Sequence, residues 1–254
     1  MKYKHEDGTP FTKEEFLQKL KMDKEFNNEF GNKGIDQISE LIRQLKEVPD
    51  SRRMCVNAWA VHDLPNMVLP PCHYGFQVYT RELSLEEQIK WYCSVYEESF
   101  EDAIRYFKVV DLSKPFKTLD GDVINFPTRA ISLMWNQRSV DTPLGLPFNI
   151  ASYAILLELL GNIVNMVPDE LIVNLGDTHI YLNQIDGIKE QLKREPFELP
   201  TLRINTEFWP TKSGECGVGE LTDDVDFLIK EMRIDDFQIE NYKSHPSIKI
   251  PLSN

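Results

Sequence analysis

Residues 130–164, AISLMWNQRSVDTPLGLPFNIASYAILLELLGNIV, decide the fold of this chain. They begin with strand-like residues at 130–136 and end with the most apolar helical stretch of the sequence, 149–164. The segment between them, 136–149, carries side chains of every hydrogen-bonding type. A buried polar group without a partner costs about 1–3 kcal/mol, so a purely structural segment would rarely place so many beside an apolar helix. We therefore interpret 136–149 as part of a functional site.

The rest of the chain is predicted to supply further helices and strands around this stretch. A capping-box pattern at Thr12 indicates a helix that ends before Gly31, and apolar residues at helical spacing over 35–45 indicate a second helix. Further strands are predicted at 54–61, 74–79, 171–175, 201–205 and 237–242, and further helices at 83–108 and 184–194. This irregular alternation indicates one α+β domain over residues 1–254, with helices packed on a mixed β-sheet.

Composition excludes several classes of protein. The chain has 254 residues, 41% of them hydrophobic, and a net charge of −13, so we do not expect nucleic acid as a partner over most of the surface. Its uninterrupted apolar runs reach about five residues, whereas a membrane span needs about 20, so no span is expected. The first residues lack an apolar run, so no secretory signal is expected. The strongly acidic stretch 215–236 is predicted to be a solvated face or a loop.

The cysteines are interpreted as free thiols. Cys55, Cys72, Cys93 and Cys216 are spread along the chain without the paired spacing of a disulfide framework. No Cys-x-x-Cys or His-x-x-x-His spacing occurs, so no metal site is expected. Free thiols are typical of a reducing compartment, and we expect the protein to be cytoplasmic.

The first candidate for chemistry is Cys72, which follows Pro70 and Pro71 and precedes His73. Two prolines stiffen the turn ahead of a predicted strand, and such a turn can hold a nucleophile toward a pocket. A thiol attacks at neutral pH only when nearby cations favour the thiolate. The alternative is a small buried apolar side chain, and the local sequence leaves both interpretations open. His73 could likewise be a base or a structural residue.

Two further clusters contain groups that bind polar ligands. Arg52 and Arg53 are adjacent after a turn; most such pairs are surface charge, but two guanidinium groups can also bind a phosphate. Residues 176–181 lie at the end of a predicted strand, where strand alternation places His179 and Tyr181 on the same side.

Together these clusters resemble the thymidylate synthase family. The resemblance runs from about Ile35 to the end of the chain. The matching motifs are Asp50-Ser51-Arg52-Arg53, Ala58-Trp59, Leu69-Pro70-Pro71-Cys72-His73, Gln77-Val78-Tyr79, Gln137-Arg138-Ser139-x-Asp141, Leu144-Gly145-x-Pro147-Phe148-Asn149-Ile150-Ala151-Ser152-Tyr153, Gly176-Asp177-Thr178-His179-Ile180-Tyr181 and Asn241-Tyr242-x-x-His245-Pro246-x-Ile248-Lys249-x-Pro251. Their number and order make the resemblance specific.

The resemblance implies a fold and a reaction. It implies a sheet-to-sheet homodimer with shared active sites that converts 2′-deoxyuridylate (dUMP) to thymidylate (dTMP) with 5,10-methylenetetrahydrofolate. Cys72 matches the cysteine that adds to C6 of the pyrimidine, after which C5 takes up the methylene group. Proton loss, elimination and hydride transfer from the folate complete the reaction. The implied partners are dUMP, a reduced folate and a second copy of the chain, with no membrane, nucleic acid or metal.

The resemblance also assigns ligands of the nucleotide. Arg138 and Ser139 match phosphate ligands of the same subunit. Arg52 and Arg53 match arginines that reach the phosphate from the other subunit. Asn149 matches the residue that reads the 3-NH and the 4-oxygen of the base.

The sugar and the folate are assigned in the same way. His179 and Tyr181 match ligands of the deoxyribose hydroxyl. Asp141 and Gly145 match folate contacts, and Asp141 is also expected near the pyrimidine. The residues expected to support Cys72 are Gln137 and His73.

The chain departs from the family pattern in several places. The family's N-terminal segment, and a tyrosine-containing segment between Gly31 and Ile35, have no counterpart here. Either this sequence omits stretches of the full chain, or the protein is a shortened relative of the family. Residues 84–127 are predicted to be a helical insertion. Gln184 stands where the family often has histidine, and the residues from Pro251 onward replace a tail that closes over the folate.

Two other functions stay open. A dUMP hydroxymethylase would share Cys72 and the folate, but water rather than hydride would capture the methylene intermediate. Asn149 favours uracil in either case, because a cytosine-specific site needs an acid there to meet the 4-amino group. A catalytically impaired, truncated paralogue could instead act as a dimer partner. The missing segments favour that paralogue, and the intact nucleotide ligands oppose it.

Overall fold

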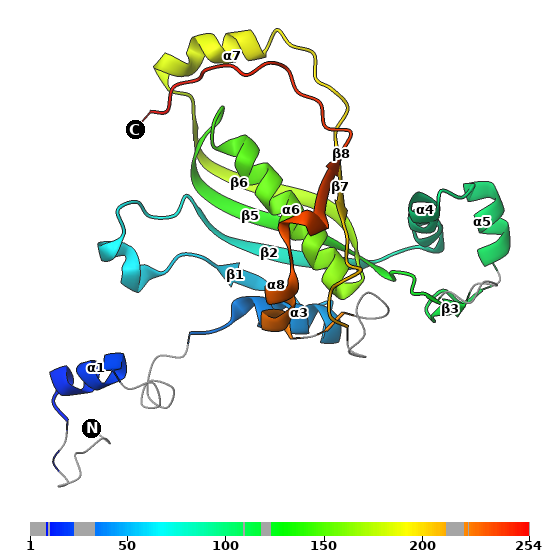
Figure 1. Ribbon diagram of the computed structural model, residues 1–254, viewed down its shortest axis with the longest axis horizontal. Coiled ribbons are helices and arrows are strands. Elements are labelled where there is room, and N and C mark those ends of the chain that lie inside the picture. Colours follow the sequence, from blue (N-terminus) through cyan, green and yellow to red (C-terminus); the bar gives the residue numbers. More distant parts are fainter. Residues whose placement is uncertain are drawn as a thin grey trace. The chain divides into compact units, whose positions relative to one another are not determined.

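The computed structural model describes residues 9, 11–22, 34–108, 110–117, 123–211, 221–222 and 224–253 (Figure 1). The chain divides into two compact units, Met1–Asp36 and Gln37–Asn254. In the first unit, α1 (Lys13–Met22) begins after the predicted capping box, in which Thr12 and Glu15 bond to each other's backbone N–H. The remainder of that predicted helix lies outside the described residues.

The second unit is built on a four-stranded mixed sheet in the order β1-β2-β5-β6. Its strands are β1 (Cys55–Asn57), β2 (His73–Glu82), β5 (Arg129–Asp141) and β6 (Val167–His179). β2 pairs antiparallel with both β1 and β5, whereas β5 and β6 are parallel. The predicted α+β class with a mixed sheet is therefore confirmed.

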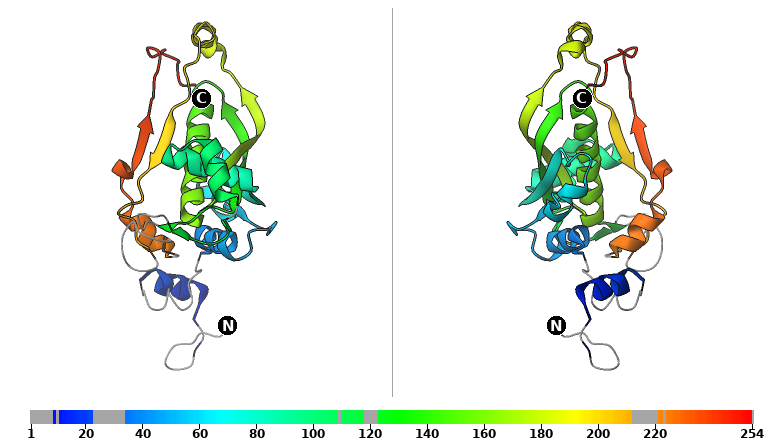
Figure 2. Two further views of the ribbon diagram at one scale, coloured as in Figure 1. Left: turned by 90° about the vertical axis from the view of Figure 1, so that its right-hand side faces the viewer. Right: turned by 90° about the vertical axis from the view of Figure 1, so that its left-hand side faces the viewer.

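The helix α6 (Leu146–Val164) connects the two parallel strands and lies on one face of the sheet. Figure 2 shows α6 between this sheet and the smaller sheet of β7 (Thr201–Ile204) and β8 (Phe237–Glu240). The cluster of buried residues that joins these layers and α3 (Gln37–Glu47) includes Leu41, Leu45, Leu133, Trp135, Tyr153, Leu157, Leu160, Trp209 and Leu228. The core of the unit thus surrounds α6.

The start of β6 depends on a close approach between α6 and the strand. A Cβ atom on Gly161 would lie 2.8 Å from the carbonyl oxygen of Met166, so only glycine fits at this point. Asn165 ends the helix in the left-handed conformation, with φ of 52°. Together the two residues turn the chain directly from α6 into β6.

Within the described residues, α6 is also the helix whose length and hydropathy would suffice to cross a membrane. The expectation of no membrane span was based on uninterrupted apolar runs, and Glu158 interrupts the apolar run within this helix. Composition alone does not separate a membrane span from a core helix. The contacts of α6 with β5 and β6 are those of a core helix.

The described residues between Leu85 and Phe126 form a smaller cluster of their own. α4 (Leu85–Tyr96) and α5 (Phe100–Phe107) pack with β3 (Phe116–Lys117) and β4 (Val123–Ile124) around buried aromatic rings that include Phe107 and Phe126. The helical stretch predicted at 83–108 forms two helices, because Glu97 ends α4 in the left-handed conformation, with φ of 55°. The predicted cap at Ser84 is confirmed by a capping box with Glu87.

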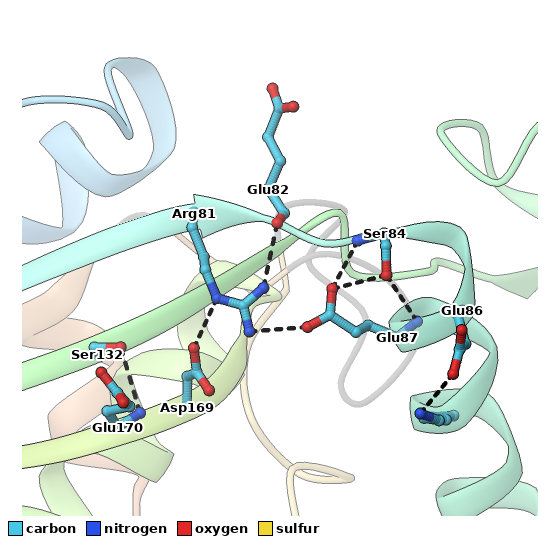
Figure 3. A network of polar contacts seen from close by, with 9 residues as sticks. Arg81, Glu82, Ser84, Glu86, Glu87, Ser132, Asp169 and Glu170 are labelled. Carbon is cyan, nitrogen blue, oxygen red and sulfur yellow. Dashed lines mark hydrogen bonds and ion pairs between the residues drawn. The ribbon is translucent and has the colours of Figure 1, made fainter.

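A polar network ties α4 to the sheet, as Figure 3 shows. The guanidinium of Arg81 on β2 donates to Asp169 on β6 at 2.9 Å and pairs with Glu87 on α4 at 2.9 Å. The hydrogen bond from Arg81 is the main reason that the pKa of Glu87 falls to about 2. Glu87 therefore holds a negative charge at the start of α4, where the helix dipole favours it.

Other predicted elements differ in length. β1 is shorter than the predicted strand 54–61, because the chain turns into the 3-10 helix η1 (Val61–Asn66). The predicted helix 184–194 consists of the 3-10 turn η2 (Leu182–Gln184) and α7 (Ile185–Gln191). Within the acidic stretch 215–236, the described residues form α8 (Val225–Glu231) and the 3-10 helix η3 (Ile234–Asp236). The described acidic residues Asp224, Glu231 and Asp235 are exposed, as a solvated face predicts, whereas Asp236 is buried and α8 packs Val225 and Leu228 into the core.

Candidate active site

Strand direction brings most of the predicted site residues to one edge of the sheet. Because β2 runs antiparallel to β5, its first residue lies beside the end of β5, and His73 pairs with Gln137. Because β5 and β6 are parallel, their carboxyl ends share the same edge, where Asp141 pairs with His179. The start of α6, with Asn149 in its second turn, follows β5 directly. This edge is the candidate active site.

Arg138 fixes the turn that carries Cys72. Its backbone N–H donates to the carbonyl of Cys72 at 2.8 Å. Its guanidinium donates to the carbonyls of Pro71 and Pro70, at 3.1 and 2.9 Å. The Cys72 thiol itself is half-buried and free; of the other described cysteines, which are also free, Cys93 is half-buried and Cys55 is exposed. The nucleophile candidate therefore sits on a turn that is bonded to the neighbouring strand at three points.

A cavity of about 420 Å³ adjoins Arg138. Its other lining residues are Asn57, Trp59, Val61 and Tyr74. Strand alternation places Arg138 on the face of the sheet away from α6, whereas Gln137 faces the helix. A cationic group beside aromatic rings suits a ligand with an anionic and a planar part.

Gln137 and Asn149 form a directed chain of hydrogen bonds. The indole N–H of Trp135 donates to Oε1 of Gln137 at 3.1 Å. The amide nitrogen of Gln137 donates to Oδ1 of Asn149 at 3.0 Å and to the carbonyl of Ser139 at 3.1 Å. Gln137 is buried, so its bonds are not exchanged with solvent. Its role as a support for Cys72 stays a prediction, because its side-chain bonds go to these other groups.

His73 is oriented by an aromatic pair. Its Nδ1 lies 3.0 Å from the hydroxyl of Tyr153, and the Tyr153 ring stacks on Trp135 with centroids 4.8 Å apart. Burial raises the pKa of Tyr153 above its ordinary value, so this phenol is protonated at neutral pH. His73 is thus held beside Cys72 by a neutral hydroxyl group.

The turn between β5 and α6 requires both residues that the family resemblance assigned to the folate. The carboxylate of Asp141 accepts from the backbone N–H of Leu144, and the carbonyl of Asp141 accepts from the N–H of Gly145. A Cβ atom on Gly145 would lie 3.0 Å from that carbonyl, so a side chain would crowd the turn. Because Gly145 has no side chain, the turn between Asp141 and the start of α6 is not crowded.

Gln184 links Asp141 to the last residues of the chain. It is fully buried, and its amide nitrogen donates to Oδ2 of Asp141 at 2.9 Å and to the carbonyl of Pro251 at 3.2 Å. Its Oε1 accepts from the backbone N–H of Tyr181. The segment around Pro251 therefore bonds directly to the site.

His179 and Tyr181 lie together as predicted, although β6 ends at His179 and Tyr181 precedes the turn η2. Their rings meet edge to face with centroids 5.0 Å apart, and Nδ1 of His179 lies 3.3 Å from the carbonyl of Asp177. Both side chains are half-buried at the carboxyl end of β6. Ser139 is also at this edge, where its carbonyl accepts from Gln137.

Arg52 and Arg53 are not part of this cluster. Both are exposed, and within the described part of the chain neither guanidinium makes a hydrogen bond or an ion pair. Their turn is nevertheless held in place: Arg129 pairs with Asp50, and the hydroxyl of Thr80 donates to the carbonyl of Pro49 at 2.7 Å.

Sequence reasoning did not identify Trp135 and Tyr153 as residues of the site. Local signals for both were present. Trp135 precedes Gln137 by two residues on a strand, so the two share a face. Tyr153 follows Asn149 by four residues on a helix, so these two share a face as well.

The fold and the site define an α+β protein in which a cysteine, two amides and a carboxylate converge at one sheet edge, an arrangement suited to covalent catalysis. Comparison with known proteins specifies the family. A model of the thymidylate synthase family matches residues 12–103 and 111–254. The chain belongs to this family. The match begins ahead of Ile35, where the resemblance was expected to begin, and its interruption lies inside the predicted insertion 84–127.

Two relatives illustrate the similarity. A probable thymidylate synthase of Escherichia phage T5 is 36% identical over 221 residues, which are 87% of this chain and 58% of the relative. A thymidylate synthase of Mycoplasma mobile is 32% identical over 247 residues, which are 92% of this chain and 64% of the relative. The chain thus spans about three fifths of the length of these relatives.

Proposed function

We propose that the protein methylates dUMP to dTMP with 5,10-methylenetetrahydrofolate, through a covalent adduct between Cys72 and C6 of the pyrimidine. The observation that carries the proposal is the sheet edge, where the Cys72 turn, the Gln137–Asn149 amide pair and Asp141 converge. Family membership supports the reaction class.

In this proposal Cys72 reacts with the pyrimidine ring of the nucleotide, and Arg138 binds its phosphate. The thiolate forms a bond to C6, and the electron pair of the C5–C6 double bond moves toward C5 and the 4-oxygen. The guanidinium of Arg138 retains N–H groups beyond the two bonded to the proline carbonyls, and these bind the phosphate. Ser139 is a second phosphate ligand.

Asn149 reads the base. Its Oδ1 faces the N–H of Gln137 and accepts as well from N3–H of uracil, and its amide nitrogen donates to the 4-oxygen. His179 and Tyr181 bind the deoxyribose hydroxyl. The amide chain from buried Gln137 to half-buried Asn149 fits a base with this donor and acceptor pattern.

The residues beside Asp141 fit a reduced folate. Phe148 in the first turn of α6 is 74% exposed, and its ring can pack against the planar part of the folate. Asp141 and Gly145 bind its polar end, and Gln184 fixes the Asp141 carboxylate. When bound, the folate supplies the methylene group and the hydride.

We further propose a homodimer that pairs the uncovered faces of two sheets. That face carries Tyr79 and Ile172, which are 63% and 41% exposed. Arg52 and Arg53 find no partner within the described residues and would bind the phosphate in the other subunit's site. The free thiols support a reducing compartment, the cytoplasm.

The test is product identity. The protein is incubated with dUMP and 5,10-methylenetetrahydrofolate, and the nucleotide product is identified by mass spectrometry. A 5-methyl product with dihydrofolate supports the proposal. A 5-hydroxymethyl product overturns it in favour of the hydroxymethylase. Nucleotide binding without turnover overturns it in favour of the catalytically impaired paralogue.

A further inference from the structure

Trp135 contacts two residues of the candidate site, Gln137 and Tyr153. The residue is 1% exposed and lies on β5, two positions before Gln137. Its indole N–H bonds to Gln137, and its ring stacks on Tyr153 with an interplanar angle of 8°. One buried side chain therefore contacts the supports of both Asn149 and His73.

The indole N–H can only donate, and this fixes the orientation of the amide of Gln137. Oε1 of Gln137 must face Trp135, so the amide nitrogen faces Asn149 and the carbonyl of Ser139. Asn149 must then turn its Oδ1 toward Gln137, because the opposite orientation would set two N–H groups against each other. The hydrogen bond from Trp135 thus fixes the orientation of the Gln137 amide, which in turn fixes the orientation of the Asn149 amide.

This orientation matters for the choice of base. Uracil offers a donor at N3 and an acceptor at position 4, whereas cytosine offers an acceptor and a donor. A freely rotating Asn149 amide could meet either base by flipping. An amide held with Oδ1 on the Gln137 side meets only the uracil pattern.

We propose that Trp135 is a positioning residue that sets the preference for a 4-oxo over a 4-amino pyrimidine nucleotide, acting through Gln137 on Asn149. The inference rests on the proposed function, since it takes the base of a nucleotide as the ligand of Asn149. The ring of Trp135 has a second role as the support of Tyr153 and, through it, of His73.

The test replaces the N–H while keeping the ring. Trp135→Phe removes the donor and retains an aromatic ring for stacking. Because the carbonyl of Ser139 still orients Gln137, we expect a partial effect: the ratio of kcat/KM for dUMP over dCMP falls about 3- to 10-fold, the range of one lost hydrogen bond. The same fall is expected in the ratio of binding constants measured by calorimetry without folate.

Two controls separate this effect from loss of stability. Trp209→Phe also removes a fully buried indole N–H, which donates to Asp236 at 2.8 Å, but it should leave the selectivity ratio unchanged. Incorporation of benzothienylalanine at position 135, in which sulfur replaces the N–H, keeps a bicyclic aromatic ring of similar size. It should lower the ratio as Trp135→Phe does.

The outcomes are distinct from those that test the proposed function. Wild-type protein that neither binds nor converts dUMP would overturn the proposed function and this inference with it. Wild-type protein that prefers dUMP, with an unchanged preference in both Trp135 variants, would overturn this inference alone.

Discussion

The backbone N–H of Arg138 donates a 2.8 Å hydrogen bond to the carbonyl of Cys72, while its guanidinium holds the carbonyls of the two preceding prolines. An arginine assigned by resemblance to the phosphate thus also anchors the nucleophile's turn. In the proposed function this one residue bridges the reactive and phosphate ends of the nucleotide, so their separation would be set by the backbone of β5 and not by a flexible loop.

Cys72 is expected to be the nucleophile. With 5-fluoro-dUMP and 5,10-methylenetetrahydrofolate, a covalent adduct should accumulate, because fluorine at C5 cannot leave as a proton does. Peptide mapping by mass spectrometry should locate it on Cys72. Cys72→Ala should abolish the adduct, whereas Cys93→Ser should retain it. An adduct on Cys55 or Cys93 would contradict the assignment.

The shared active site is testable by mixing two inactive chains. A Cys72→Ala chain keeps Arg52, and an Arg52→Ala chain keeps Cys72, so one site of their heterodimer has both groups. At equal and random mixing we expect about a quarter of wild-type activity, because half of the dimers carry one intact site. The measurement is activity after unfolding and refolding the mixture. Heterodimers that form but have no activity would refute the model of partner arginines.

Asn149→Asp should shift the base preference from uracil toward cytosine. The carboxylate can still accept from Gln137, but its second oxygen would accept from the 4-amino group of cytosine and repel the 4-oxygen of uracil. A mismatched buried pair costs about 1–3 kcal/mol, so the kcat/KM ratio of dUMP over dCMP should fall about 10- to 100-fold. Asn162→Asp, at the other end of α6, serves as the control and should leave the ratio unchanged. An unaltered ratio in Asn149→Asp would show that Asn149 does not read the base.

Glu158 should make stability depend on pH in a defined direction. Burial raises the pKa of this α6 carboxyl above its ordinary value of 4.5, so the folded protein binds the proton more tightly than the unfolded chain does. Stability should therefore fall as pH rises from the unfolded to the folded pKa, and remain lower above that range. Glu158→Gln, neutral at every pH, should raise Tm at pH 7.5.

The gain from Glu158→Gln should shrink to near zero at pH 4, below the ordinary pKa of 4.5, where the carboxyl is mostly protonated in both states. Thermal unfolding of both proteins at the two pH values measures the difference, in which other titrating groups cancel. Glu207→Gln, at an exposed position, should show no such dependence. A gain of equal size at pH 4 would mean that desolvation of the charge is not its cause.

Local sequence signals predicted the starts of elements well. Ser84 and Thr12 cap their helices as expected, because capping bonds involve residues only three positions apart. Strand lengths were predicted less well. β6 extends beyond the predicted 171–175 to Val167–His179, through a proline and a glycine, because pairing with β5 stabilises residues of low strand propensity.

The site was predicted as a set of residues but not as an arrangement. The polar segment 136–149 was expected between a strand and a helix, yet Gln137 and Asp141 lie on β5 itself. The amide chain from Trp135 to Asn149, and the link from Gln184 to Pro251, join residues whose proximity depends on tertiary packing. A pattern of residue types carries no information about which hydrogen bond each amide makes.

The register of β5 in the sheet determines what a folding error does to this protein. On β5, Trp135 and Gln137 face the core while Arg138 faces away, so a shift of one residue would bury a guanidinium and expose the indole. Such a shifted chain would lose its core together with its active site. Errors in folding should therefore yield unfolded protein and not a stable, inactive fold. The specific activity of any preparation should accordingly rise in proportion to its folded fraction. A measurement of core packing would therefore also report the fraction of functional active sites.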